Sequence, residues 1–206
     1  EVCYQCLYEL MGIVMKNLIT LIFSLVVSFQ SLAEIKPDFD KGYVAFKSGD
    51  VETALLHWVT LANSGSEKAQ MVLGEISRYG KGVEKAPDTA ITWYERAAKQ
   101  GNSDAQAILG HMYRLGEGIE KNDSTAVVWY TKAAKQGDAE SQKYLGVMYE
   151  GGYGVSKNNE IAFLWFKKAA DQGDADAAVN VGASYVLGRG VAPNEKEASR
   201  WFLRAA

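Results

Sequence analysis

Cysteine and histidine are the residues of this chain whose types could support redox, metal or nucleophilic chemistry. Cys3 and Cys6 form a C-x-x-C pair, a spacing found in thiol redox motifs and metal sites. The pair precedes Met15 and has no second ligand pair, so we expect no chemistry from it. His57 and His111 are far apart in the sequence, and no H-E-x-x-H motif surrounds either. We therefore expect no catalytic residue, no metal site and no cofactor.

Of two further catalytic patterns, one is incomplete and the other is absent from the sequence. The segment from Gly74 to Lys81 resembles a phosphate-binding loop, but five residues separate Gly74 from Gly80 where the motif has four, and Gly82 follows the lysine where Ser or Thr is required. The S-x-x-K motif of serine β-lactamases does not occur.

The composition narrows the class of protein. The chain has 206 residues, of which 48% are hydrophobic, too many for an intrinsically disordered protein. Its net charge of -3 argues against nucleic-acid binding, which needs a basic face.

The first 33 residues indicate export. Residues 1–14 look like an upstream or non-native segment, and Met15 is the better start. From there to Ala33 the order is a short basic region, an apolar stretch and small residues at the end, which predicts a signal peptide at residues 15–33 cut after Ala33. The alternative is a retained anchor, but residues 18–33 fall short of the roughly 20 needed to span a membrane. We therefore expect a periplasmic or secreted protein without stable membrane insertion after cleavage.

The elements that position the remaining residues repeat with a fixed period of 36 residues. The repeated positions are Gly74, Gly110, Gly146 and Gly182; Trp93, Trp129, Trp165 and Trp201; and the glycine pairs that begin at Gly80, Gly116, Gly152 and Gly188. Such a period is typical of a solenoid built from one supersecondary unit. The predicted fold is all-α, an α/α superhelical solenoid of helix-turn-helix repeats.

Residues 103–138 illustrate the two helices expected in each unit. The apolar side chains of the first half recur at helical spacing, and Gly116 can end that helix in the left-handed conformation. Asn122 is a good N-cap for the second helix. Asn158 and Asn194 cap the equivalent helices, Glu197 could complete a capping box with Asn194, and Pro87 suits position N1.

Glycine within a helix costs up to about 1 kcal/mol relative to alanine, so the glycine row from Gly74 needs a compensation. We expect the two helices of a unit to approach closely there, with the Trp and Tyr rings of the second helix against the glycine. The Trp and Tyr rows are then core, and the alanine pairs such as Ala97-Ala98 allow units to stack.

The motif at residues 109–119, LGHMYRLGEGI, followed by A-x-x-W-x-x-x-A-A-x-x-G, resembles the Sel1-like repeat family, which is related to tetratricopeptide repeats. The resemblance covers four units, at residues 67–102, 103–138, 139–174 and 175–206, and the last unit is expected to be truncated. Residues 34–66 are similar to a divergent helical pair. Phe39, Tyr43 and Phe46 would line its first helix, and Trp58 would match Trp93 with one residue lost.

The resemblance implies a protein-protein interaction scaffold with no catalytic activity. By analogy with tetratricopeptide superhelices, the first helices would line a concave face that binds a protein partner of unknown identity. The residues expected on that face are Lys68, Met71, Glu75, Arg78, Asp104, Ala107, His111, Arg114, Glu140, Lys143, Val147, Glu150, Asp176, Val179, Ala183 and Val186. Arg78 and Arg114 should lie side by side.

An alternative function comes from cysteine-rich members of the family, described as penicillin-binding or β-lactamase-like enzymes. Those members have paired cysteines within each repeat, whereas this chain has no cysteine after Cys6. This difference favours the scaffold.

The last predicted helix carries Ala198, Trp201, Phe202 and Ala205 with no later helix to cover them. We expect a contiguous apolar end there, as in a chain that continues further or an end that docks onto another molecule.

We predict that the exported protein begins at Glu34, because residues 31–33 fit a signal-peptidase site. N-terminal sequencing of the protein from separated cell fractions measures this. A chain that retains Met15 in the membrane fraction would show an uncleaved anchor instead.

Overall fold

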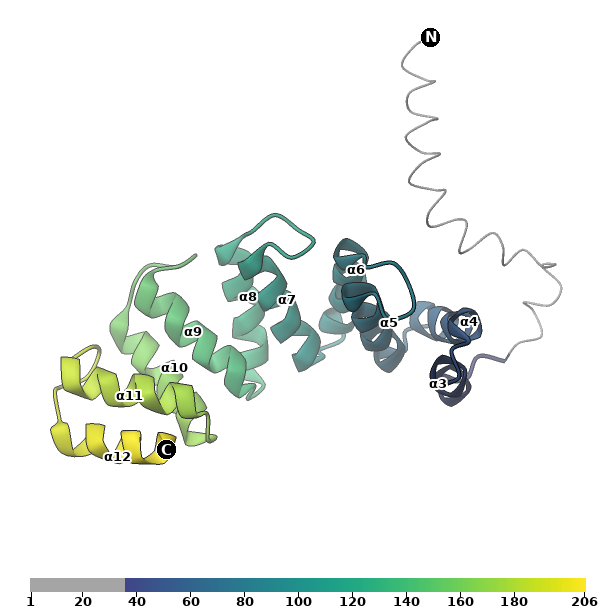
Figure 1. Cartoon of the computed structure of the whole chain (residues 1–206). Coiled ribbons are helices and arrows are strands. Elements are labelled where there is room, and N and C mark those ends of the chain that lie inside the picture. Colours follow the sequence, from purple (N-terminus) through teal and green to yellow (C-terminus); the bar gives the residue numbers. More distant parts are fainter. Residues whose placement is uncertain (1–35) are drawn as a thin grey trace, which may run out of the picture. The chain divides into compact units, whose positions relative to one another are not determined.

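The structure, a computed structural model, describes residues 36–206, and every regular element in this part of the chain is an α-helix (Figure 1). The helices are α3 (Phe39–Lys47), α4 (Val51–Asn63), α5 (Glu67–Tyr79), α6 (Pro87–Lys99), α7 (Ser103–Leu115), α8 (Asp123–Lys135), α9 (Ala139–Gly151), α10 (Asn159–Asp171), α11 (Ala175–Leu187) and α12 (Glu195–Ala205). The prediction of an all-α fold of helix-turn-helix repeats is confirmed. The C-x-x-C pair, the predicted signal peptide and its cut lie outside the described residues.

The helices pack in two alternating kinds of contact. Within a unit the first helix packs against the second, as α5 does on α6 and α7 on α8. The second helix of each unit then packs against the first helix of the next unit, as α6 does on α7. Each unit therefore buries one side against its neighbour, which is how a solenoid builds a continuous core.

The helix ends follow the local sequence. Gly116 ends α7 at φ 73°, in the left-handed region that glycine adopts without strain. The side chains of Asn122, Asn158 and Asn194 cap α8, α10 and α12, as predicted. The predicted capping box is wrong, because the backbone N–H of Asn194 donates to Tyr185 and the Glu197 carboxylate pairs with Arg200.

The helices of each unit approach most closely at the glycine in the middle of the first helix. A Cβ atom on Gly110 would lie 2.6 Å from Cδ1 of the Tyr130 ring on α8. The equivalent glycines meet Tyr94, Phe166 and Phe202. The compensation expected for glycine in a helix is therefore present, but the ring belongs to the residue that follows each tryptophan.

The tryptophans of the second helices pack at the interface between neighbouring units. Trp129 on α8 is buried in a cluster with side chains of α6 and α7, and Trp201 on α12 is buried in one with α10 and α11. Trp93 and Trp165 are only half-buried, but they pack against the equivalent clusters. Each indole thus touches the preceding unit.

The pair α3 and α4 is a shortened version of the same unit. Trp58 is 1% exposed, packs between Phe39 and Phe46, and lies where a Cβ on Gly42 would be 2.6 Å from its Nε1. Trp58 therefore takes the place of Tyr94, 36 residues later, and the expected match to Trp93 with one residue lost is wrong. Tyr43 was expected to line this helix with Phe39 and Phe46, but its side chain is half exposed.

Glutamines join neighbouring units through buried hydrogen bonds. Gln70, Gln106 and Gln142 on the first helices donate through Nε2 to carbonyls of Ala62, Ala98 and Ala134, near the end of the preceding second helix, at 3.0–3.1 Å. Their Oε1 atoms each accept from Gln100, Gln136 and Gln172 of their own unit at 2.8 Å. We call each such pair a glutamine rung.

The apolar side chains of the last unit are less exposed than predicted. Ala198 and Trp201 are buried, because the tryptophan side of a second helix faces the preceding unit. Phe202 is 40% exposed, whereas the equivalent rings Tyr94, Tyr130 and Phe166 are buried. None of the helices within residues 36–206 is long and apolar enough to cross a membrane.

We predict that Gly110→Val lowers the free energy of unfolding by about 1–3 kcal/mol, because the new side chain must displace the Tyr130 ring. Chemical denaturation followed by helical circular dichroism measures the change. Leu115→Val, at the exposed end of the same helix, is the matched control. Equal midpoints for the two variants would contradict the packing at Gly110.

Candidate partner-binding face

The outward positions of α5, α7, α9 and α11 form what we call the first-helix face. The residues expected to bind a partner lie on these helices, and all but one are exposed or half-buried. The exception is Ala107, which is 8% exposed and so is wrongly placed among the binding residues. Lys68, Glu75, Asp104, Glu140, Val147, Asp176, Val179 and Val186 are exposed; Met71, Arg78, His111, Arg114, Lys143, Glu150 and Ala183 are half-buried.

Arg78 on α5 is engaged with the next unit. Its guanidinium forms a two-pronged ion pair with Glu117, which follows α7, with Nη2 2.6 Å from Oε2 and Nε 3.0 Å from Oε1. The two side chains are only 15% and 27% exposed. The hydrogen bond from Arg78 lowers the pKa of Glu117. The charge of Arg78, expected to be available to a partner, is therefore used between units.

Arg114 holds the equivalent position on α7 but has a different environment. The residue equivalent to Glu117 is Tyr153, which cannot complete an ion pair. Arg114 Nε donates to Oη of Tyr130 at 3.3 Å, and its guanidinium carbon lies 4.9 Å from the centre of the Tyr144 ring. None of the ion pairs within residues 36–206 includes Arg114.

His111 connects Tyr130, Tyr144 and Glu140 beside Arg114. Its Nδ1 lies 3.1 Å from Oη of Tyr130, and its Nε2 lies 3.6 Å from Glu140 Oε1. Its ring meets Tyr144 edge-on, and Tyr144 stacks on Tyr130. Burial lowers the pKa of His111, although Glu140 opposes the shift, so the imidazole is neutral at pH 7. We call His111, Arg114, Tyr130 and Tyr144 the aromatic cluster.

Toward α11 the charges of the face are paired and its surface turns apolar. Lys143 on α9 lies 2.9 Å from Asp176 and 3.3 Å from Asp174. Glu150 pairs with Arg189 of the next unit at 3.2 Å. On α11, the outward side chains Val179 and Val186 are 46% and 53% exposed. The face therefore changes from charged to apolar between α9 and α11.

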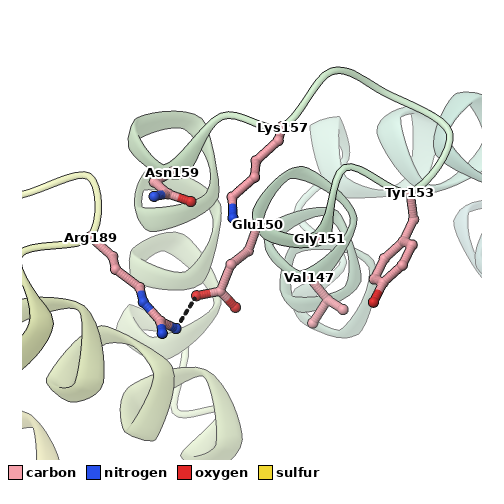
Figure 2. A pocket seen from close by; sticks show the side chains of 7 residues that line it. All are labelled: Val147, Glu150, Gly151, Tyr153, Lys157, Asn159 and Arg189. Carbon is pink, nitrogen blue, oxygen red and sulfur yellow. Dashed lines mark hydrogen bonds and ion pairs between the residues drawn. The ribbon is translucent and has the colours of Figure 1, made fainter.

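A pocket of about 350 Å³ opens at the end of α9 (Figure 2). Figure 2 shows Lys157 reaching toward Glu150, which is bonded to Arg189, while Tyr153 lies on the other side of the helix end beside Gly151. Val147 and Asn159 complete the lining. These groups suit polar and aromatic contacts. Within residues 36–206 no three His, Cys, Asp or Glu side chains gather in a way that could hold a metal ion.

The outward cations of the second helices repeat, in contrast to those of the first. Arg96, Lys132, Lys168 and Arg204 each lie 4.0–4.7 Å from the ring centre of the tryptophan three residues earlier. These cations thus cover the tryptophan ring in each of the four units from α5 to α12. No such rule governs the first-helix face, where the same position holds Arg78, Arg114, Glu150 and Val186 in turn.

Comparisons with known proteins agree with this architecture. The Sel1 repeat model matches residues 67–102, 103–138, 139–174 and 175–206. The chain belongs to the Sel1-repeat family. Proteins built from Sel1 repeats are generally protein-interaction scaffolds.

Two solved structures of Sel1-type repeat proteins resemble this chain. A Sel1 repeat protein from Oxalobacter formigenes is 34% identical with a TM-score of 0.75, over 82% of this chain and 69% of that one. The protein c5321, a protective antigen of uropathogenic Escherichia coli with an SLR fold, is 30% identical with a TM-score of 0.76, over 81% of this chain and 37% of that one. A comparison with curated proteins found no match.

We predict that the bridge between Arg78 and Glu117 couples the stability of neighbouring units. Arg78→Gln, Glu117→Gln and the double variant should reveal a coupling energy of about 1–2 kcal/mol at pH 7, because the pair is two-pronged and largely buried. Denaturant unfolding measures it. The exposed pair of Arg200 with Glu197 is the control, and it should couple by less than about 1 kcal/mol.

The coupling should also depend on pH. Arg78 lowers the pKa of Glu117 in the folded chain, so the stabilisation is present above the unfolded pKa of Glu, about 4.3, and is lost as the pH falls through the folded value. A coupling that stays constant into acid, or that matches the control, would contradict the bridge.

Proposed function

We propose that this chain is a non-catalytic scaffold, exported to the periplasm, which binds a protein partner on the first-helix face. The face is proposed to line the concave side of the solenoid. No nucleic acid is expected as partner, because the chain has a net charge of -3.

The observation that carries the proposal is the contrast between the two outward surfaces. On the second helices the recurrent cations stack on tryptophans of their own helix, so these charges have a structural task. On the first helices the equivalent outward position holds Arg78, Arg114, Glu150 and Val186 in turn, while the glycine row beneath it stays the same. A surface that varies over an unchanging core is suited to recognising one particular partner along its length.

The apolar residues at one end of this face support a protein as the partner. Val147, Val179 and Val186 are between 37% and 53% exposed and come from the first helices of two adjacent units. Burial of such side chains against another protein would release about 25 cal/mol per Å² of apolar surface. The export part of the proposal rests on the sequence of residues 15–33.

We predict that photo-reactive amino acids at Val147 and Val186 cross-link to the same protein in intact cells. Mass spectrometry of the adducts identifies the partner. The matched controls are Val128 and Leu164, which are exposed to 53% and 57% on the second helices. Adducts from the control positions alone would place the partner on the other surface.

The purified protein should leave the β-lactam nitrocefin intact. Its hydrolysis by wild-type protein would instead support an enzyme.

A further inference from the structure

Two of the ion pairs between units share one spacing in the sequence, and the residue between them at the equivalent position has no such pair. A first-helix residue pairs with the residue 39 positions later, after the first helix of the next unit: Arg78 with Glu117, and Glu150 with Arg189. Between these two pairs, the same spacing joins Arg114 to Tyr153. The repeat thus directs a guanidinium toward a place that holds no carboxylate.

Tyr153 does not supply Arg114 with a carboxylate, and its ring packs elsewhere. A Cβ atom on Gly151 would lie 2.6 Å from Cδ2 of Tyr153, so the tyrosine ring covers the glycine at the end of α9. The other first helices have Tyr79, Leu115 and Leu187 at the position of Gly151. The exchange of a large residue for glycine therefore accommodates the ring. Tyr153 is 53% exposed and borders the pocket at the end of α9, together with Val147 (Figure 2).

The tyrosine hydroxyl groups of Tyr94 and Tyr130, near the two arginines, indicate how Arg114 can bind an anion. In the first unit Arg78 gives its Nε to Glu117, and among residues 36–206 no group forms a hydrogen bond with the buried Oη of Tyr94. In the second unit Arg114 gives its Nε to Oη of Tyr130. Tyr130 has a second partner, Nδ1 of His111, where the first unit has Glu75. Arg114 can therefore turn to a carboxylate without leaving Tyr130 unpaired.

We propose that Arg114 binds the carboxylate of an Asp or Glu side chain from the protein partner, in the geometry that Glu117 adopts on Arg78. An apolar side chain next to that acid contacts Tyr153 and Val147. This inference rests on the proposed function, since it names the chemistry of the partner segment. The nearby acid Glu140 lies 3.6 Å from His111, and none of the ion pairs within residues 36–206 joins it to Arg114, so the guanidinium is available to a carboxylate of the partner.

The probe is the peptide acetyl-Gly-Phe-Glu-Phe-Gly-amide, with Gln in place of Glu as the matched control. Side-chain Nε–Hε resonances of arginine in the whole protein report on binding, and Arg114→Gln identifies the resonance of Arg114. The Glu peptide should shift this resonance in a saturable way at roughly millimolar concentration, and the Gln peptide should bind roughly threefold to tenfold more weakly. The resonance of Arg78, already paired with Glu117, should stay in place.

The variant Tyr153→Glu tests the same geometry with a carboxylate that belongs to the chain itself. The new carboxylate should pair with Arg114 and abolish the response to the Glu peptide, whereas Tyr153→Gln should preserve it. An Arg114 resonance that ignores the Glu peptide, or moves equally with both peptides, overturns the proposal. So does an undiminished response in Tyr153→Glu.

Cross-linking distinguishes a failure of the Arg114 site from a failure of the proposed scaffold function. Cross-linking at Val147 and Val186 that persists in Arg114→Gln and in Tyr153→Glu would leave the scaffold intact and refute the site at Arg114. Cross-linking at neither position in the wild-type protein would refute the scaffold itself.

Discussion

The close approach of two helices at one glycine is the constraint on which this solenoid depends. Gly110 and its equivalents let a flat ring lie directly against the backbone of the first helix, which fixes the separation within a unit. The alanines at the end of the second helix then pack against the first helix of the next unit. The ion pairs and glutamine rungs can then recur at constant offsets in the sequence.

Much of the fold was predictable because it depends on local rules that repeat. Gly116 and Asn122 mark helix ends through backbone conformation and a short-range hydrogen bond, and both act as predicted. The register of Trp58 was mispredicted, and of the Trp and Tyr rings predicted to lie against Gly110 only that of Tyr130 does so, for a common reason. Tryptophan is the more prominent residue of the Trp-Tyr pair, but adjacent residues on a helix point about 100° apart, and only packing decides which one faces the partner helix.

The chemistry of the face was less accessible to sequence analysis. The prediction located Arg78 and Arg114 on the same surface. Whether each arginine forms an ion pair depends on the residue at position 117 or 153, which in each case belongs to the next unit. A search for opposite charges at a constant offset would have found the bridges of Arg78 and Glu150. The repeated glutamines, 30 residues apart within each rung, were an equally clear signal.

The glutamine rungs are absent at the last joint, where Ala178 replaces the glutamine. There the carbonyl of Ala170 accepts instead from Nη2 of Arg204 at 3.2 Å, and the side chain of Arg204 is 48% exposed. Water competes readily for such a bond, whereas it does not reach the buried glutamines. In a quasi-one-dimensional protein this difference sets an order of opening. The amides of α11 should exchange with solvent through opening of the joint between α10 and α11, before those at the joints held by Gln106 and Gln142.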